Sequence, residues 1–306
     1  MPSLRKLVVT GATGKQGGAL IAALQSQSSP AFTIYAVTRD TTSPSAQRLA
    51  NQANVEVIRG DFGDAKAIFR QVDKPWGLFA MTNQMAGEKL EKQQGVSLVQ
   101  AAVNAGIEHI VFSATDRGGQ VKSDSNPTNV PHFRSKYSVE QEIKKKSDQS
   151  DGKLTWTFLR PVAFFENLTP NFFGKGFVAM WRLNGLDRPL QQISTADIGR
   201  IAAEAFIHAD SDEYRNTAIS LAGDELSPNE AAKIFQEVTG REIPATWGFV
   251  GWLLKMLSAD LRLMFQWFFD EDFGVDVKAL RQRYPFLRSF REWLKEESAW
   301  KKMRSA

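Results

Sequence analysis

The first half of the chain alternates between short apolar runs and longer stretches with helical spacing. The apolar runs are rich in β-branched and aromatic residues and predict six strands, at 7–10, 31–38, 55–62, 77–82, 110–113 and 154–159. Helical spacing covers 87–106 and 132–146, and Gly106 is a typical residue to end the first of these helices. The pattern predicts a doubly wound α/β fold with a parallel sheet.

The first strand runs into a turn with glycines at 11, 14 and 17, and a helix pattern follows. Gly11 allows the chain to turn sharply, Gly14 allows a pyrophosphate to approach the backbone, and Gly17 allows the helix to pack against the sheet. The amide groups at the start of the helix and the positive end of its dipole favour an anion. This context predicts a dinucleotide-binding turn.

The pattern changes after residue 160. Aromatic residues crowd 164–181, with nearby glycines at 174, 176 and 185, and predict an irregular hydrophobic wall instead of a regular crossover. A helix is expected within 191–209, a strand at 217–221, a capping box at Ser227–Glu230, and further helices in the Trp-rich 244–306. We expect an NAD(P)-binding Rossmann-type domain at 1–160, with 189–225 returning to it, and a smaller, mostly helical substrate or cap domain at 161–188 and 226–306.

Composition narrows the class of protein. Hydrophobic residues make up 42% of the 306 residues and charged residues 24%, as in ordinary globular proteins. With no cysteine and three histidines, we expect no disulfide and no metal site. The net charge of +4 is scattered and no nucleic-acid-binding motif appears, so we expect no nucleic-acid partner. No signal-peptide pattern opens the chain, and the apolar stretch 243–254 is too short to span a bilayer, so we expect a cytoplasmic protein without membrane contact.

The ends of the second and third strands bear on the choice of cofactor. An acidic residue normally follows the second strand and binds the ribose 2′-hydroxyl group, but here Arg39 stands there, followed by Asp40. A guanidinium group suits a 2′-phosphate, so we expect NADP(H). Asp61, with its neighbour Phe62, would face the adenine, or Asp61 would cap the next helix.

Several motifs along the chain share a pattern with one protein family. They are Gly11-Ala-Thr-Gly-Lys-Gln-Gly-Gly18, Val37-Thr-Arg39, Gly60-Asp61, His132-Phe-x-x-Lys136 and Arg160-Pro-x-x-Phe-Phe-Glu-Asn-Leu168. Together they resemble the NmrA-like proteins of the atypical short-chain dehydrogenase/reductase superfamily, over essentially the whole chain. That family includes reductases, some of them in secondary metabolism, and NADP-sensing regulators that bind transcription factors.

The resemblance implies where NADP(H) binds. The glycine turn would hold its phosphates, and Lys136 would lie against the nicotinamide ribose. Two further segments would line the nicotinamide from opposite sides, Ala163–Phe164 and Met81–Asn83. The implied cofactor contacts are therefore Gly11, Thr13, Gly14, Lys15, Gln16, Gly17, Arg39, Asp61, Phe62, Met81, Thr82, Asn83, Lys136, Ala163 and Phe164.

The catalytic residues depart from the superfamily's Ser and Tyr-x-x-x-Lys pattern. Ser113 and Lys136 are present, but the Tyr position carries His132, and Tyr137 is about 100° further round the helix. His132 is a candidate proton donor, or it only opens the helix. Reduction of an iminium carbon needs no acid, so the site suits C=N reduction at least as well as ketone reduction. Asp116 and Glu166 are candidate stabilisers of a cation. Alternatively, Asp116 only forms bonds within its loop, and Glu166 is only a structural cap.

The aromatic residues after 160 would line an apolar pocket, or form ordinary core. We expect Phe164, Glu166, Asn167, Trp247 and Trp252 to contact a small hydrophobic organic substrate. The first hypothesis is an NADP(H)-dependent reductase of a bulky carbonyl or imine compound, with cyclisation coupled to it in secondary metabolism. The second is a non-catalytic NADP(H) sensor that binds a transcription factor or another protein partner.

Overall fold

Short apolar strands form a seven-stranded sheet in the computed structural model, which describes residues 4–28 and 31–303. The strands are β1 (Arg5–Val9), β2 (Phe32–Thr38), β3 (Val55–Arg59), β4 (Gly77–Ala80), β5 (His109–Ser113), β6 (Thr155–Pro161) and β9 (Thr217–Leu221). Their order is β3-β2-β1-β4-β5-β6-β9, and β1 to β6 pair in parallel. The order reverses between β1 and β4, where ligands bind in such sheets. The predicted doubly wound α/β fold is confirmed.

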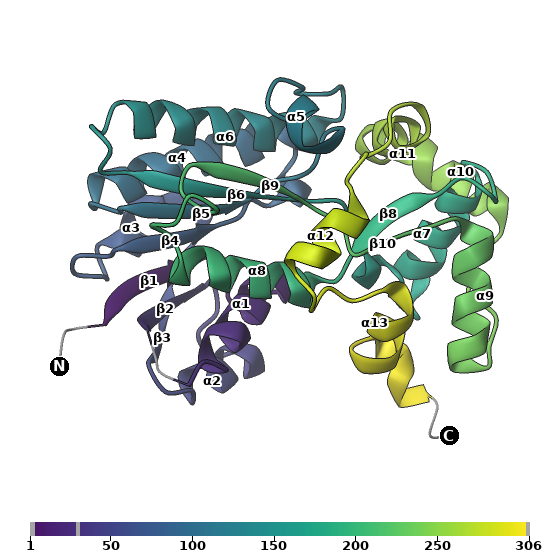
Figure 1. Ribbon diagram of the computed structural model, residues 1–306, viewed down its shortest axis with the longest axis horizontal. Coiled ribbons are helices and arrows are strands. Elements are labelled where there is room, and N and C mark those ends of the chain that lie inside the picture. Colours follow the sequence, from purple (N-terminus) through teal and green to yellow (C-terminus); the bar gives the residue numbers. More distant parts are fainter. Residues whose placement is uncertain (1–3, 29–30, 304–306) are drawn as a thin grey trace. The chain divides into compact units, whose positions relative to one another are not determined.

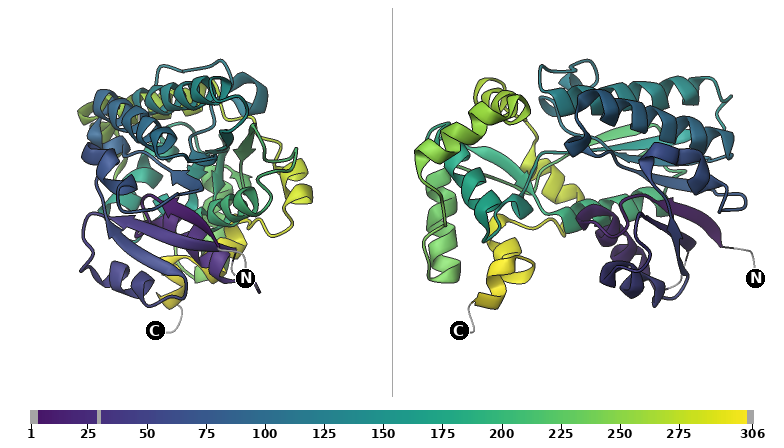
Figure 2. Two further views of the ribbon diagram at one scale, coloured as in Figure 1. Left: turned by 90° about the vertical axis from the view of Figure 1, so that its left-hand side faces the viewer. Right: turned by 180° about the vertical axis from the view of Figure 1, so that it is seen from behind.

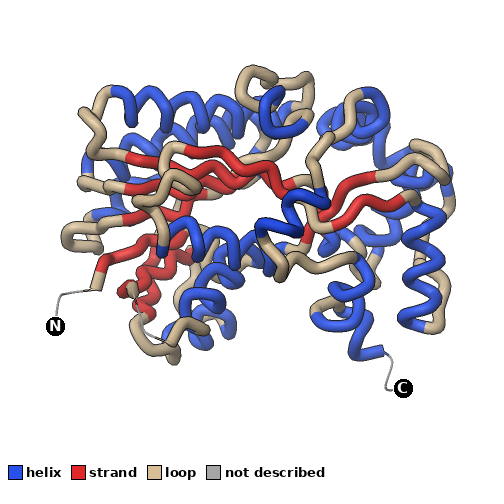
Figure 3. The backbone as a smooth tube through the Cα atoms, viewed as in Figure 1, coloured by secondary structure: helices blue, strands red, loops and turns tan. Residues whose placement is uncertain are grey.

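Helices cover both faces of this sheet (Figures 1 and 3). They are α1 (Lys15–Gln25), α2 (Pro44–Ala50), α3 (Ala65–Phe69), α4 (Glu88–Asn104), α6 (Pro131–Asp148) and α8 (Thr195–Ile207). One core cluster joins α3, α4 and α6 to the sheet, and includes Ile68, Leu98 and Val139. On the other face α1 and α8 pack closely, since a Cβ atom at Gly199 would lie 2.5 Å from the Ala19 backbone.

The contacts between residues divide the chain into two compact units. The first contains residues 1–115, 132–160 and 198–219, and the second contains 116–131, 161–197 and 220–306. The second unit has its own three-stranded sheet, in the order β10-β8-β7, with helices beside it (Figure 2). Its elements are β7 (Ala163–Phe164), β8 (Leu190–Ile193), β10 (Asp224–Leu226), α5 (Gly119–Lys122), α7 (Phe172–Arg182), α9 (Pro228–Thr239), α10 (Gly248–Leu257), α11 (Ala259–Asp270), α12 (Val277–Arg283) and α13 (Phe290–Glu296).

One prediction for the second unit was wrong. The expected irregular wall contains a regular helix, α7. The glycines of α7 serve close packing: a Cβ atom at Gly174 would lie 2.0 Å from the Thr169 carbonyl oxygen, and one at Gly176 would lie 2.8 Å from a Leu254 methyl group. The predicted capping box at Ser227 is confirmed, because Ser227 and Glu230 bond each other's backbone amides.

Candidate active site

The turn between β1 and α1 has the shape that a phosphate-binding turn requires. Gly11 has a φ of +60°, and a Cβ atom there would lie 2.3 Å from the Met81 sulfur. A Cβ atom at Gly17 would lie 2.4 Å from the Gly11 carbonyl oxygen, so α1 packs directly on the turn. Helix α1 begins after Gly14 with no side-chain cap and no acidic residue in its first turn. Its positive end therefore suits an anion.

Hydrogen bonds join this turn to the carboxyl ends of the neighbouring strands. The Ser113 hydroxyl group at the end of β5 donates to the Gln16 side-chain oxygen at 2.6 Å. Thr10 donates to the Phe79 carbonyl oxygen at 2.9 Å and accepts from the Met81 amide at 3.2 Å. The structure thus brings the predicted residues Gly11, Gln16, Met81 and Ser113 together.

The ends of β2 and β3 carry the residues predicted for the adenosine part of the cofactor. Arg39 is exposed and makes no ion pair within the described residues 4–28 and 31–303. The Asp40 carboxylate accepts from the Thr42 hydroxyl group at 2.6 Å and the Thr42 amide at 2.8 Å, and these bonds lower its pKa. Asp61 accepts from the Gly63 amide at 2.7 Å and caps a short helical turn that begins at Phe62. An exposed cationic group that makes no ion pair within the described chain therefore lies directly after β2, and its contact with a 2′-phosphate stays a prediction.

Lys136 belongs to a buried polar cluster. Its ammonium group donates to the Glu91 carboxylate at 2.5 Å and to the Thr82 hydroxyl group at 2.8 Å. The Thr82 hydroxyl group donates to the same Glu91 oxygen at 2.6 Å, and Ser135 donates to the other at 2.5 Å. The Glu91 side chain is fully buried, and that of Lys136 is 11% exposed. Residues of β4's carboxyl end, α4 and α6 thus meet at one carboxylate.

Glu91 was not predicted from the sequence. It lies in the first turn of α4, among exposed charged residues, yet it shares the buried face of that helix with Gly95, Leu98 and Ala102. Gly95 allows the close approach, because a Cβ atom there would lie 2.4 Å from Val139 and 3.0 Å from Thr82. The helical periodicity of these buried positions, extended back by one turn, is the signal that could have identified it.

His132 is the second residue of α6 and is buried, with its ring edge-on to Phe133 at 4.7 Å between ring centres. This position fits both interpretations of His132, as a proton donor or as the residue that opens the helix. Asn83 is exposed, and its side chain accepts from the Met85 amide at 3.2 Å. The catalytic roles of His132 and Ser113 stay predictions.

Asp116 lies in the second unit and is fully buried. Its carboxylate accepts from the amides of Gly118 and Gly119 at 3.0 and 2.8 Å, and from the hydroxyl groups of Ser123 and Ser220 at 3.3 and 2.5 Å. Burial raises the pKa of Asp116 even though these donors oppose the shift. The contacts are those of a loop-bonding residue, and a catalytic role stays a prediction.

The residues predicted to contact substrate are spread through the second unit. Glu166 accepts from the amide of Thr195, the first residue of α8, at 3.1 Å, and from the Trp293 indole nitrogen at 3.2 Å. Ala163 and Phe164 form β7 and are half-buried, as is Asn167. Trp247 and Trp252 are 75% and 58% exposed, so they lie on the surface of this unit, and their contact with a substrate stays a prediction.

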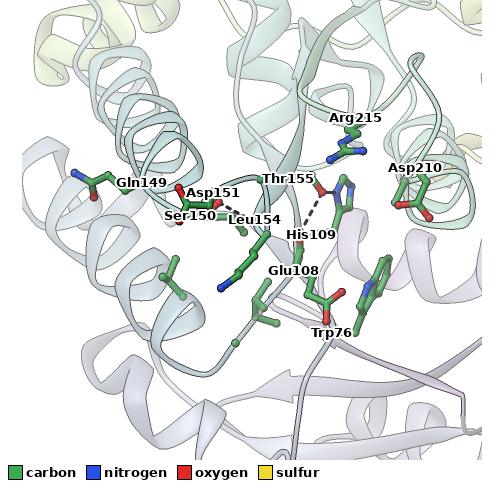
Figure 4. Close-up of a pocket in the computed structure, with 16 residues that line it drawn as sticks. Trp76, Glu108, His109, Gln149, Ser150, Asp151, Leu154, Thr155, Asp210 and Arg215 are labelled. Atoms are coloured by element: carbon green, nitrogen blue, oxygen red, sulfur yellow. Dashed lines mark hydrogen bonds between the residues drawn. The ribbon is translucent and has the colours of Figure 1, made fainter.

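A cavity of about 640 Å³ lies at the amino ends of the central strands, near the beginning of β5 (Figure 4). His109, Trp76 and Thr155 are among the residues that line it. His109 begins β5, whereas Ser113 at the glycine turn ends it, so this cavity is separate from the candidate site. Among the described residues, no cluster of acidic or histidine side chains could hold a metal ion, and no helix is long and apolar enough to cross a membrane.

Comparison with known proteins identifies similar chains. The sequence model of the NmrA-like family matches residues 4–290. An NmrA-like family domain-containing oxidoreductase of Aspergillus hancockii is 28% identical over 79% of this chain and 75% of its own. The structure of NmrA, a negative transcriptional regulator, in complex with NADP has a TM-score of 0.73 at 19% identity, over 99% of this chain and 98% of its own. The Citrobacter sp. triphenylmethane reductase complexed with NADP(H) has a TM-score of 0.72 at 20% identity, over 95% and 99%.

Proposed function

Because the chain belongs to the NmrA-like family, we propose that it is an NADPH-dependent reductase of a bulky hydrophobic carbonyl or imine compound. The observation that carries this proposal is the place of the Lys136 cluster. Lys136 bonds Thr82, and the residue before Thr82, Met81, packs on Gly11 of the glycine turn. A lysine held this close to the glycine turn is suited to bind the nicotinamide ribose hydroxyl groups.

The residues present fit NADP(H). The uncapped start of α1 and the close packing of Gly17 suit the pyrophosphate, and Arg39, with no ion pair in the described chain, suits the 2′-phosphate. When bound, NADPH supplies a hydride from its nicotinamide ring. The protein residues would hold the ribose through Lys136 and exclude water through the buried side chains around it.

Relatives support the reaction class. The Aspergillus hancockii protein is named an oxidoreductase, and the Citrobacter sp. neighbour is a reductase complexed with NADP(H). An imine or iminium substrate agrees with the absence of a tyrosine at position 132. The coupled cyclisation and the place in secondary metabolism stay predictions.

The test is the consumption of NADPH over a panel of cyclic imines, iminium salts and bicyclic ketones. We expect turnover of at least one member, and a fall in kcat/KM of about 100-fold or more in Lys136→Met, the loss typical of a positioned catalytic group. Lys145→Met is the matched control, because Lys145 is exposed on the same helix.

Tight NADPH binding without turnover of any panel member would contradict the reductase proposal. It would instead favour the second hypothesis, a cofactor sensor. A sensor predicts that binding of its protein partner differs between NADP⁺ and NADPH.

A further inference from the structure

The Lys136 cluster contains two opposite charges that compensate each other. The ammonium group of Lys136 and the carboxylate of Glu91 are in contact at 2.5 Å, and both side chains are at least nearly buried. Glu91 also accepts from the Thr82 and Ser135 hydroxyl groups, so three donors fix its two oxygens. The lysine therefore enters the candidate site as part of a neutral pair.

A second ion pair joins the same two helices but differs in its surroundings. Glu88, in the same turn of α4 as Glu91, accepts two hydrogen bonds from Arg134 of α6, at 2.9 and 2.7 Å. The side chain of Glu88 is 37% exposed and that of Arg134 is 43% exposed, so solvent screens their charges. The pair of Glu91 and Lys136 lacks that screening, so removing either charge would leave the other one acting on anything bound beside the pair.

We propose that Glu91 is a positioning residue that makes this site select a cationic hydride acceptor, an iminium ion, over a ketone. The inference rests on the proposed function, under which Lys136 lies beside the nicotinamide ribose. Glu91 acts through Lys136: it holds the ammonium group in place and cancels its field at the acceptor.

The two reactions differ in the charge that they create. When an iminium ion is reduced, the hydride forms a bond to carbon, the C=N π pair moves onto nitrogen, and a neutral amine results without any proton. The positive charge moves from the acceptor to the oxidised nicotinamide, and no new charge appears. A ketone instead gains a negative charge on oxygen, which needs a neighbouring cation or a proton.

The cluster stabilises an oxyanion only weakly, and it does not repel a cation. The ammonium group of Lys136 already donates to Glu91 and Thr82, and position 132 holds histidine instead of the tyrosine that would protonate oxygen. An uncompensated lysine would repel an iminium ion. The neutral pair admits the iminium ion and gives a ketone no net positive field.

The experiment compares two bicyclic substrates of similar size, N-methyl-3,4-dihydroisoquinolinium, which is permanently cationic, and 1-tetralone. The readout is the ratio of their kcat/KM values with saturating NADPH, so that differences in intrinsic reactivity cancel between variants. Glu91→Gln leaves Lys136 uncompensated and is expected to lower the ratio of iminium to ketone about tenfold. This is the effect of one unit charge about 10 Å away at an effective dielectric constant of about 20.

Two further variants separate charge from structure. The double variant Glu91→Gln/Lys136→Met is neutral again, so its ratio is expected to return to within about threefold of wild type, even where both rates are lower. Glu88→Gln removes the same charge from the exposed pair and is expected to leave the ratio unchanged. A folded Glu91→Gln protein with an unchanged ratio, or a double variant that stays as low as the single one, would overturn the proposal.

A binding measurement separates this proposal from the reductase function. N,N-dimethyl-1,2,3,4-tetrahydroisoquinolinium is cationic and cannot be reduced, so its affinity in the presence of NADPH is measured by calorimetry. We expect Glu91→Gln to weaken it about tenfold and to change the affinity for 1-tetralone less than threefold. That result without turnover of any substrate would contradict the reductase function and support charge selection by Glu91. Wild-type protein that reduces 1-tetralone with a kcat/KM equal to or above that of the iminium ion would overturn the selection, whether or not the variants fold.

Discussion

Replacing His109 with glutamine is expected to remove part of the acid sensitivity of the fold. His109 begins β5 and is 1% exposed, with its Nδ1 atom 2.8 Å from the Thr155 hydroxyl oxygen. Its ring stacks on Trp76 and meets Phe206 edge-on, at 6.1 and 5.9 Å between ring centres. Burial lowers the pKa of His109 from 6.5 to about 4, mainly because the charged imidazolium would lose its hydration.

The direction and size of the effect follow from this pKa. Between pH 6.5 and about 4 the unfolded chain takes up a proton at His109 and the native chain does not, so the free energy of unfolding falls as the pH falls. Above pH 6.5 this contribution is fully present. A difference of about 2.5 pKa units corresponds to about 3 kcal/mol at roughly 1.36 kcal/mol per unit. Asp116 and other groups titrate in both proteins, so they cancel in the difference between wild type and His109→Gln.

The assay is urea unfolding of wild type and His109→Gln at about pH 7.5, 5.5 and 4.5, followed by circular dichroism. Wild type is expected to lose more stability than the variant, and the gap between them should change by up to about 3 kcal/mol toward low pH. His208→Gln is the control, since the His208 side chain is 56% exposed. A gap between wild type and His109→Gln that stays constant with pH would contradict the lowered pKa of buried His109.

Three further predictions test other parts of the structure. Glu140→Gln breaks a fully buried ion pair in which Arg160 donates to the Glu140 carboxylate at 3.0 and 2.9 Å. Urea unfolding should show that the free energy of unfolding falls by about 3–5 kcal/mol, and a fall of less than about 1 kcal/mol would contradict the burial of the pair. Gly17→Ala places a Cβ atom 2.4 Å from a backbone oxygen of the turn, so the turn must shift. The affinity for NADPH, measured by nicotinamide fluorescence, should fall tenfold or more (about 1.4 kcal/mol), and an unchanged affinity would contradict the turn geometry. Arg39→Ala should weaken NADPH binding about tenfold or more and leave NADH binding unchanged, whereas Arg70→Ala should alter neither; wild type that binds both cofactors equally would contradict the 2′-phosphate contact.

The sequence predicted the large sheet well, because its determinants are local. Periodicity and β-branched residues identified the strands to within a few positions, and 217–221 coincides with β9. The glycine turn was equally predictable, since the positive φ of Gly11 and the close packing of Gly17 on the Gly11 carbonyl oxygen are requirements within the same short segment. The resemblance to the NmrA-like family is confirmed by the family match over residues 4–290.

Features set by contacts between distant segments were not predictable in the same way. Glycines such as those of α7 are typical of loops, but Gly176 lies in a helix and allows close packing against Leu254, a residue of a distant segment. Glu91 resembles a surface residue among charged neighbours, and only the packing of α4 on α6 buries it against Lys136. The roles of the predicted site residues therefore depend on tertiary packing that the local pattern does not contain.

Transfer of deuterium from the cofactor to the product is the most direct test of the proposed reductase function. NADPH with deuterium at both C4 positions of the nicotinamide is supplied with a cyclic iminium substrate, and the product amine is analysed by mass spectrometry and NMR. We expect one deuterium on the former iminium carbon for each NADP⁺ formed, and loss of this product in Lys136→Met. Unlabelled product, or no product from protein that binds NADPH, would contradict it.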